Sequence, residues 1–453
     1  MMTEQQYANW LRNPSAVRVL LAELHHANGV EYVATRPYIS KPTDSLPNQP
    51  FNDVLSSAVD VSTRLDAQVD LGDIKLTDDG HLTHWREYSW AGWPVVLRLG
   101  DSSWSYDDFR VIANQINAGI GSARRGEIVM GIYDATAQLD TPIERDLING
   151  QSVPLVFGSV FGGVAQRVNT TELRYRASWL PVTGLVVRDG TGPVISHTPD
   201  YSNGSFVASA YSPRTLSCEI TEPHNTPELI INWVANHYGI TVDPALTLPS
   251  VSVGLRYDGD VSGRQILDDV CSAIGAFWQI NLLGQLTVQR LEAPGVPDLI
   301  IDADDIEYGR IALVATEQPW RSLSVNYGRN YNVLSEVAGS IEDTDPVLAE
   351  RLRTENQTVT QTQSLPNYPL AEEITRDLAL TSATDATAEC ARLLALRSVQ
   401  RERWELTIML QPEVDLVGKT LQVNHPRLTG RTGRIISNRM APIKNKLQIE
   451  VWY

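Results

Sequence analysis

The sequence predicts a mainly β protein with an α+β unit between two β-rich ends, and three observations lead to this prediction. Apolar and polar residues alternate over much of the first 133 residues and again over the last fifty, as they do in strands with one buried face. Two helical patterns with start and stop signals fall between residues 226 and 275. The length of 453 residues also exceeds that of one domain, because domains have roughly 100–200 residues.

The N-terminal third shows strand patterns separated by turns. Residues 17–24 and 30–38 flank an Asn28-Gly29 pair, and Asn-Gly between two apolar runs favours a hairpin. We therefore predict a β-barrel over residues 1–150, followed by a small β domain over residues 151–222 that begins near Val153. Further extended runs are expected over residues 59–73, 93–100, 109–120 and 127–133.

The middle of the chain carries signals for two helices and a hairpin. Thr226-Pro227-Glu228 combines a capping hydroxyl, a proline in the first turn and an acidic residue, as helix starts do. Ser262 begins a second helix in a capping-box pattern. Gly239 and Gly275 are expected to end the two helices, and apolar residues on either side of Leu283-Gly284 predict the hairpin. We therefore predict an α+β domain over residues 223–299.

The C-terminal part, residues 300–453, is predicted to be a second β-barrel with one insertion. Residues 335–368 are polar and rich in Thr, Gln and Glu, so we expect a long insertion or loop there, and we expect a helix over residues 385–403. Because the chain stops inside the last strand pattern, that strand must be hydrogen-bonded into a sheet to be ordered. The four final strand patterns cover residues 404–410, 419–425, 433–439 and 447–453.

The composition limits the classes of function. The formal net charge of −17 argues against an electrostatic grip on nucleic acid, which requires clustered Lys and Arg. It is compatible with a surface past which DNA moves without binding, because like charges repel. The sequence shows neither a signal peptide nor a run of about 18 apolar residues, so we expect synthesis in the cytoplasm. The three cysteines are far apart and are expected to be buried thiols: Cys218, Cys271 and Cys390.

Histidine and glycine motifs do not complete a metal or phosphate site. The histidine pairs lack a third ligand close in sequence. The lysine-containing motif lacks the upstream glycine of a phosphate loop and precedes a strand rather than a helix. We therefore predict no catalytic residue, no cofactor and no metal ligand. The motifs are His81-Leu82-Thr83-His84, His25-His26, Gly418-Lys419-Thr420 and the glycine-rich run 158–163.

Paired acids and clustered tryptophans keep two alternatives open. Glycosidases use two carboxylates across a sugar, but adjacent acids on a strand point to opposite faces, so turn or capping roles are favoured. Tryptophans could form a sugar-binding platform, although core packing is favoured because large aromatic side chains dominate burial in small β domains. The residues concerned are Asp107-Asp108, Asp304-Asp305, Trp85, Trp90, Trp93 and Trp104.

Three stretches are characteristic in their order along the chain. They comprise residues 80–85 with 93–100 and 109–112, residues 153–161, and residues 418–428 with 447–453. Together they resemble the central hub proteins at the tip or baseplate of bacteriophage tails, particularly long non-contractile tails. Residues 262–288 also look like the middle domain of those hubs, whereas residues 335–368 match nothing in the family.

The resemblance implies a mechanical role. Such hubs are similar to two tail-tube barrels fused in one chain, with smaller domains inserted, so three copies adapt a sixfold tube to a threefold tip. It implies a homotrimer in the virion, assembled in the host cytoplasm, that closes the tube and forms part of the genome-ejection channel. DNA would pass through without specific binding, and no enzyme activity is expected. The implied partners are the distal tail protein, the tape-measure protein and tail fibres or tip proteins.

Two other functions stay open at this point. The chain could be a carbohydrate- or receptor-binding tail protein that uses exposed tryptophans. It could also be a cell-wall polysaccharide hydrolase, which would require two acids about 5–10 Å apart in a cleft.

Overall fold

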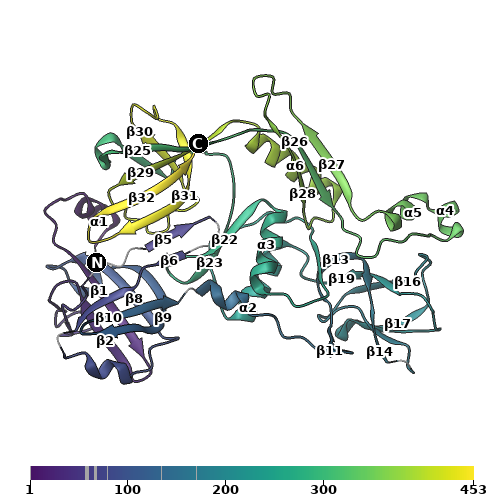
Figure 1. Cartoon of the computed structure of the whole chain (residues 1–453), viewed down its shortest axis with the longest axis horizontal. Coiled ribbons are helices and arrows are strands. Elements are labelled where there is room, and N and C mark those ends of the chain that lie inside the picture. Colours follow the sequence, from purple (N-terminus) through teal and green to yellow (C-terminus); the bar gives the residue numbers. More distant parts are fainter. Residues whose placement is uncertain (1, 57–60, 66–68, 79, 134, 170) are drawn as a thin grey trace.

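The structure is a computed structural model that describes residues 2–56, 61–65, 69–78, 80–133, 135–169 and 171–453. Strands predominate over helices along the chain, so the predicted mainly β class is confirmed. Two curled sheets, built from the two ends of the chain, lie together on one side of an elongated molecule (Figure 1). The described part of the chain holds no helix that is long and apolar enough to cross a membrane.

The N-terminal sheet has six antiparallel strands in the order β2-β1-β8-β9-β10-β7. The predicted hairpin is present, because His26 pairs with Gly29 across the Ala27-Asn28 turn. Helix α1 (Glu4–Leu11) precedes the sheet and begins with a capping box between Thr3 and Gln6. The strands are β1 (Arg18–His26), β2 (Gly29–Ala34), β7 (Ile74–Asp78), β8 (Pro94–Asp101), β9 (Arg110–Arg124) and β10 (Gly126–Tyr133), and a small pair is formed by β3 (Tyr38–Ile39) and β4 (Pro50–Phe51).

The C-terminal sheet has the strand order β24-β30-β31-β32-β29-β25. Its last strand, β32, pairs with both β29 and β31, which confirms that the chain ends inside a hydrogen-bonded strand. Two strands from the N-terminal third, β5 (Val61–Arg64) and β6 (Val69–Leu71), are added to this sheet through β31. The six strands of the main path are β24 (Leu299–Asp302), β25 (Ile306–Glu317), β29 (Arg401–Ile408), β30 (Thr420–Asn424), β31 (Thr432–Ala441) and β32 (Lys446–Trp452).

The segment after the N-terminal sheet forms further strands, most of them short. Two four-stranded sheets have the orders β16-β19-β13-β21 and β14-β15-β18-β17, and β11 pairs with β12. The strands are β11 (Leu147–Ile148), β12 (Gln151–Ser152), β13 (Leu155–Val164), β14 (Gln166–Asn169), β15 (Arg174–Arg176), β16 (Gly184–Arg188), β17 (His197–Asp200), β18 (Ser205–Ala208), β19 (Ser217–Thr221) and β21 (Gly254–Tyr257).

The middle unit contains the two predicted helices and the predicted hairpin. Helices α2 (Pro227–Tyr238) and α3 (Gly263–Ala273) are followed by Gly239 and, one residue beyond the α3 cap, Gly275, both with positive φ. The hairpin joins β22 (Ala276–Ile280) to β23 (Gln285–Arg290), and β20 (Thr241–Val242) pairs with β23. Thr226 occupies the N-cap position of α2, as predicted, but the expected capping by its hydroxyl is wrong, because that group makes no hydrogen bond to the start of the helix in the described structure.

The prediction of a long loop over residues 335–368 is wrong. This segment forms α4 (Gly339–Thr344), α5 (Pro346–Arg353) and β27 (Gln357–Thr362). Strand β27 pairs with β26 (Trp320–Tyr327), which also pairs with β28 (Glu372–Asp377). The polarity that predicted a loop arises because β27 is an edge strand whose threonines are exposed, and threonine, being β-branched, is favoured in strands.

Helix α6 (Ala383–Arg397) packs on the three-stranded sheet of β26, β27 and β28. It ends six residues before the predicted end at residue 403, because β29 begins at Arg401. The Cys390 thiol donates to the Leu323 carbonyl oxygen at 3.3 Å. All three cysteines are buried free thiols, as predicted.

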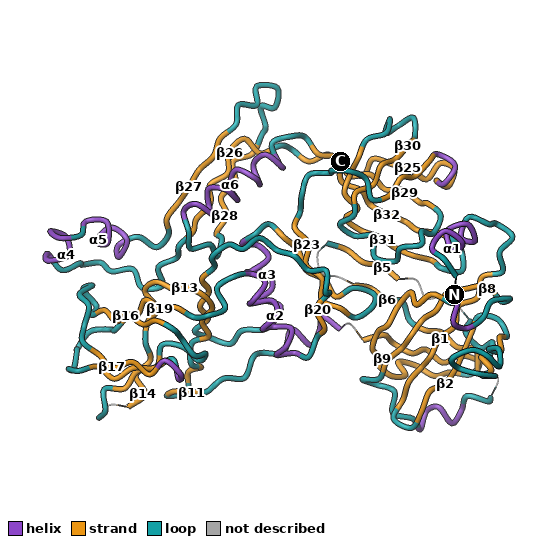
Figure 2. Tube along the Cα trace, turned by 180° about the vertical axis from the view of Figure 1, so that it is seen from behind, coloured by secondary structure: helices purple, strands orange, loops and turns teal. Residues whose placement is uncertain are grey.

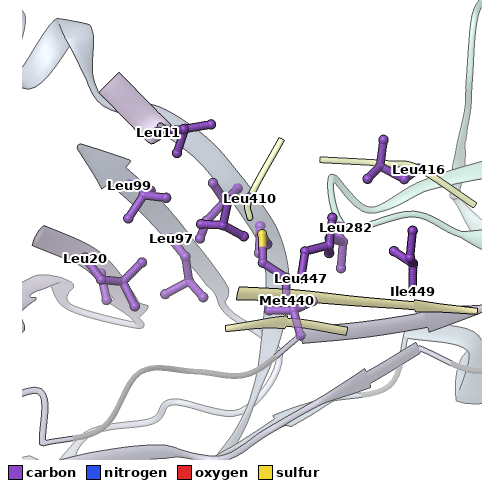
Figure 3. Close-up of a cluster of buried hydrophobic side chains, with 14 of the residues drawn as sticks. Leu11, Leu20, Leu97, Leu99, Leu282, Leu410, Leu416, Met440, Leu447 and Ile449 are labelled. Carbon is purple, nitrogen blue, oxygen red and sulfur yellow. The ribbon is translucent and has the colours of Figure 1, made fainter. Parts of the chain in front are cut away.

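Two large apolar cores organise these sheets. One core combines side chains from both terminal sheets, and Figure 3 shows Leu97 and Leu99 of β8 in the same cluster as Met440 and Leu447 of β31 and β32. The other core combines α2 and α3 with β26, β28 and α6. Figure 2 shows the same grouping from behind, with α2 and α3 between the terminal sheets and the strands β13 and β19. The predicted domain boundaries at residues 150, 222 and 299 stay a prediction.

Candidate functional site: the junction of the terminal sheets

The two ends of the chain are joined by backbone hydrogen bonds. Strand β5 pairs antiparallel with β31, with Val61 opposite Met440 and Thr63 opposite Asn438. The Thr63 hydroxyl donates to Asn438 Oδ1 at 2.5 Å, and both side chains are buried. A strand from the N-terminal third is therefore part of the C-terminal sheet.

Helix α1 closes one side of this junction. Leu11, at its end, lies in the apolar core shared by the two sheets, and Figure 3 shows it above the Leu97 and Leu99 side chains. The Asn445 side-chain amide donates to the Leu11 carbonyl oxygen at 3.0 Å. The Arg12 guanidinium lies 3.5 Å from the Asp305 carboxylate. These contacts tie the N-terminus to two separate turns of the C-terminal sheet.

The hairpin of the middle unit inserts its tip between the two sheets. Leu282 at the tip is buried in the shared core. Its carbonyl oxygen accepts from the Asn114 backbone N–H at 2.7 Å and from Gln115 Nε2 at 3.0 Å. Asn281 shapes the turn, because its side-chain oxygen accepts from the backbone N–H groups of Leu283 and Gln285. The hairpin thus couples the middle unit to strand β9.

A carboxyl group lies where the same hairpin meets the C-terminal sheet. Asp415 Oδ1 accepts a long hydrogen bond of 3.4 Å from Gln279 Nε2 on β22. Burial raises the pKa of Asp415 to about 6, and Glu413 and Asp243 act in the same direction, whereas Lys419 opposes the shift. Lys419 forms its ion pair with Glu413 at 2.9 Å. Asp415 is therefore a titratable group at the contact between two units.

The outer strand β25 presents apolar side chains to solvent. It ends the strand order of the C-terminal sheet, so its outer backbone groups have no strand partner among the described residues. Tyr308 is fully exposed, and Leu313 and Val314 are about half exposed. An edge strand with exposed apolar side chains is a surface that pairs readily with another chain. The arrangement at this end of the molecule therefore suits assembly.

Comparisons with known proteins give structural similarities at low sequence identity. No protein-family model matches the sequence, and no curated protein matches it either. The fold is similar to solved tail proteins. A 43 kDa prophage tail protein from Shewanella oneidensis has 10% identity and a TM-score of 0.44, with 96% of this chain and 98% of that chain covered. A tail protein from Neisseria meningitidis has 8% identity and a TM-score of 0.48, with 96% and 97% covered. A prophage tail protein from Listeria monocytogenes has 9% identity and a TM-score of 0.46, with 96% and 94% covered.

The tryptophans singled out from the sequence serve mainly in packing. Trp85 and Trp90 are buried, and Trp90 Nε1 donates to the Trp85 carbonyl oxygen at 2.8 Å. Trp104 packs against Trp10 with ring centroids 4.5 Å apart. Trp93 is 41% exposed. The predicted core role is confirmed for Trp85 and Trp90, which therefore do not form a sugar-binding platform.

The paired acids serve turns and the N-terminus. Asp107 accepts from the Ser45 backbone N–H at 3.0 Å, and Asp108 accepts from the Met2 backbone N–H at 2.8 Å. Asp304 and Asp305 belong to a short 3-10 helix, Ala303–Asp305, that Asp302 caps. The turn interpretation is confirmed for both pairs, because Asp107 and Asp108 also belong to a short 3-10 helix, Tyr106–Asp108, from which they anchor neighbouring segments.

Residues of the histidine and glycine motifs take part in packing. His26 stacks on Tyr88 at 4.3 Å, and His84 meets the edge of the same ring at 5.6 Å. Within the described part of the chain, no group of three or more His, Cys, Asp or Glu side chains could hold a metal ion. In the glycine-rich run, Gly158 has a φ of +64°, and a Cβ there would lie 2.0 Å from the Val253 carbonyl oxygen. This glycine is required by close backbone packing.

Two hollows in the surface were not predicted from the sequence. A pocket of about 450 Å³ contains Asp269, whose carboxylate accepts from the Tyr257 hydroxyl at 2.7 Å. Burial raises the pKa of Asp269 and that of Tyr257. A wider hollow lies beside α2 and is lined by Trp179 and Trp233. Each site combines segments that are far apart in the sequence, so no single local motif indicates it.

Proposed function

We propose that the protein is a structural component of a bacteriophage virion, in which three copies form a hub at the distal end of the tail tube. The hub closes the tube and then forms part of the channel through which the genome leaves. The proposal starts from the order of the three sequence stretches that resemble tail hubs. It adds the fold of the two chain ends, which are curled, largely antiparallel sheets with one shared core.

The pairing of β5 with β31 is the observation that supports this function most directly. A hub subunit has to hold its two terminal sheets in a fixed relation to each other, because a hinge between them would open gaps in the ring. Here a strand from the N-terminal third is joined to the C-terminal sheet by backbone hydrogen bonds and a buried Thr63–Asn438 bond, and the two terminal sheets share a continuous apolar core. Packed cores resist deformation, so the two ends move as one body.

Strand β25 is the surface proposed for contact between subunits. In a closed ring, each copy offers an edge to its neighbour, and β25 combines an edge that has no strand partner among the described residues with the exposed side chains of Tyr308, Leu313 and Val314. Burying these side chains in a neighbouring copy removes apolar surface from water, which favours association.

The net charge of −17 is consistent with passage of DNA through such a ring. A negatively charged wall repels phosphates, so the genome moves without binding. The proposed partners are the distal tail protein above the ring, the tape-measure protein inside the tube and tip or fibre proteins below it.

The mass of the purified protein in solution tests the proposal. We expect a species of three times the 50.2 kDa chain mass, measured by light scattering behind size-exclusion chromatography. The double variant Leu313→Asp/Val314→Asp should shift the mass to that of one chain, because it places charges in the subunit contact.

The matched control is Val347→Asp on α5, at an apolar position that is 79% exposed and lies far from β25. It should leave the trimer intact. The proposed function would be contradicted if the wild-type protein remained monomeric at about 100 µM, a concentration well above the dissociation constant of a stable interface.

A further inference from the structure

The hollow beside helix α2 is a groove whose lining suits a ligand. Five of its residues share one face of α2 through spacings of three and four residues, and they remain partly or fully exposed although the opposite face is buried in the core. The hollow measures about 570 Å³, within the roughly 300–1,000 Å³ of small-molecule sites. The five residues are Leu229, Asn232, Trp233, Asn236 and His237.

Two tryptophan rings give this groove fixed aromatic surfaces. Trp233 stacks on His237 with centroids 5.3 Å apart and an interplanar angle of 12°, and it meets the edge of Phe157 at 5.0 Å. Trp179 also lines the groove, and its backbone N–H donates to the Pro154 carbonyl oxygen at 2.7 Å. Both rings pack in part against the core of the middle unit. They are therefore held in place before any ligand arrives.

Polar groups around the rings are available for hydrogen bonds. The side-chain amides of Asn232 and Asn236 and the indole N–H groups of Trp179 and Trp233 make no hydrogen bond to the residues that the structure describes. By contrast, the indole N–H of Trp278, close by in the same unit, donates to Asp268 at 2.7 Å. An asparagine amide both donates and accepts, which is the combination that a hydroxyl group requires.

A buried glutamate orients one more side chain of the groove. Glu222 is buried and accepts from the backbone N–H groups of Gly158 and His224. Its other oxygen lies 2.6 Å from His224 Nδ1. With Nδ1 engaged by the carboxylate, Nε2 is the ring nitrogen left for a ligand. The His224 ring is thus fixed by a partner outside the groove.

We infer that this groove binds a neutral oligosaccharide. None of its lining residues is Asp, Glu, Lys or Arg, so a charged ligand would lose its hydration without gaining an ion pair. A sugar presents an apolar face that packs on an aromatic ring and hydroxyl groups that pair with amides and indole N–H groups. The inference goes beyond the proposed tail function and does not depend on trimer formation.

Titration calorimetry with defined probes tests the inference. The probes are chitotetraose and maltotetraose as neutral saccharides, and choline and tetraproline as ligands that also bind aromatic surfaces. At least one saccharide should bind the full chain with a Kd of about 0.1–1 mM. The double variant Asn232→Ala/Asn236→Ala should weaken that binding by about tenfold or more, since it removes two hydrogen-bonding amides.

Matched controls separate the groove from general effects. Asn9→Ala removes an exposed asparagine from helix α1, and Trp93→Ala removes an exposed tryptophan from the N-terminal sheet. Both should bind saccharide as the wild type does. The inference is overturned if neither saccharide binds at about 10 mM, a concentration above the expected Kd. It is also overturned if the double variant binds equally well, or if choline or tetraproline is the sole ligand.

Discussion

Gly158 shows how one residue fixes the start of the second β region. Its φ of +64° suits glycine, and a Cβ would lie 2.0 Å from the Val253 carbonyl oxygen of the neighbouring segment. Gly158→Ala should therefore lower the free energy of unfolding by about 3 kcal/mol or more, through strain and overpacking together. Urea denaturation measures this change.

Gly259→Ala is the control for this substitution. A Cβ at Gly259 meets nothing within 4 Å, so the variant should unfold like the wild type. A Gly158→Ala protein of unchanged stability would show that β13 and Val253 are not packed as the structure has them.

Asp415 should give the protein a pH-dependent stability. Its pKa is about 6 when folded, against an ordinary value of 3.8, so the folded state binds more protons than the unfolded state between these values. Stability contributed by the protonated carboxyl is present at low pH and is lost as pH rises through this window. Asp415→Asn should remove that slope and gain on the order of 2 kcal/mol at pH 7 relative to the wild type.

Urea denaturation at about pH 5 and pH 7 measures how the free energy of unfolding changes with pH in the wild type and in Asp415→Asn. The change is expected between the unfolded and folded pKa values of Asp415. Asp304→Asn, at an exposed turn position, is the control and should keep the wild-type pH dependence. Equal slopes for Asp415→Asn and the wild type would place Asp415 in water rather than at the hairpin contact.

At the scale of elements, the hairpin tip offers a pair of neighbouring leucines with opposite environments. Leu282 is 2% exposed in the shared core, whereas Leu283 is 44% exposed. Leu282→Ala should lower the free energy of unfolding by about 2–5 kcal/mol, because it leaves a cavity. Leu283→Ala should change it by less than about 0.5 kcal/mol. Similar losses for both variants would mean that the tip does not insert between the sheets.

The junction of β5 and β31 contains a buried hydrogen bond between a threonine and an asparagine. A second hydrogen bond of the same kind lies on an exposed strand face. Thr63 donates to buried Asn438, and Thr358 donates to Asn326 at 2.7 Å on an exposed strand face. Thr63→Val should cost about 1–3 kcal/mol, since it leaves a buried oxygen unpaired. Thr358→Val should cost little, because water replaces the hydroxyl. Equal costs, measured by chemical denaturation, would contradict the burial of the junction.

Local patterns predicted most elements but not their associations. The Asn28-Gly29 hairpin, the glycine stops of α2 and α3 and the final strands follow from turn chemistry and period-two alternation. The segment 335–368 was expected to be a loop because polarity alone does not distinguish a solvated edge strand from a loop. The addition of β5 to β31, across 375 residues at Thr63–Asn438, depends on long-range packing that no local pattern encodes.

The candidate sites were predicted less well for the same reason. Trp85 and Trp90 were correctly expected in the core, since aromatic side chains in a dense strand region bury readily. Trp179 and Trp233 lie 54 positions apart in the sequence, counted from their numbers, and only the packing of α2 against the strands brings them together.

At the scale of the whole molecule, the two ends of the chain share one core, and the edge strand β25 has no strand partner among the residues that the structure describes. Three copies arranged in a ring would enclose a channel, and each chain would contribute its two terminal sheets to the wall of that channel. The fold of the terminal sheets and the closure of the ring are separate questions. The structure shows the fold of the sheets and their shared core, whereas closure of the ring depends on contacts between copies.

Electron microscopy of the purified assembly, viewed along its axis, tests the central claim most directly. We predict a closed ring with threefold symmetry, six similar lobes of density and an open or plugged channel at the centre, with both terminal sheets of each chain on the channel side. A ring in which one terminal sheet of each chain points outward, or an assembly with no common channel, would contradict the account.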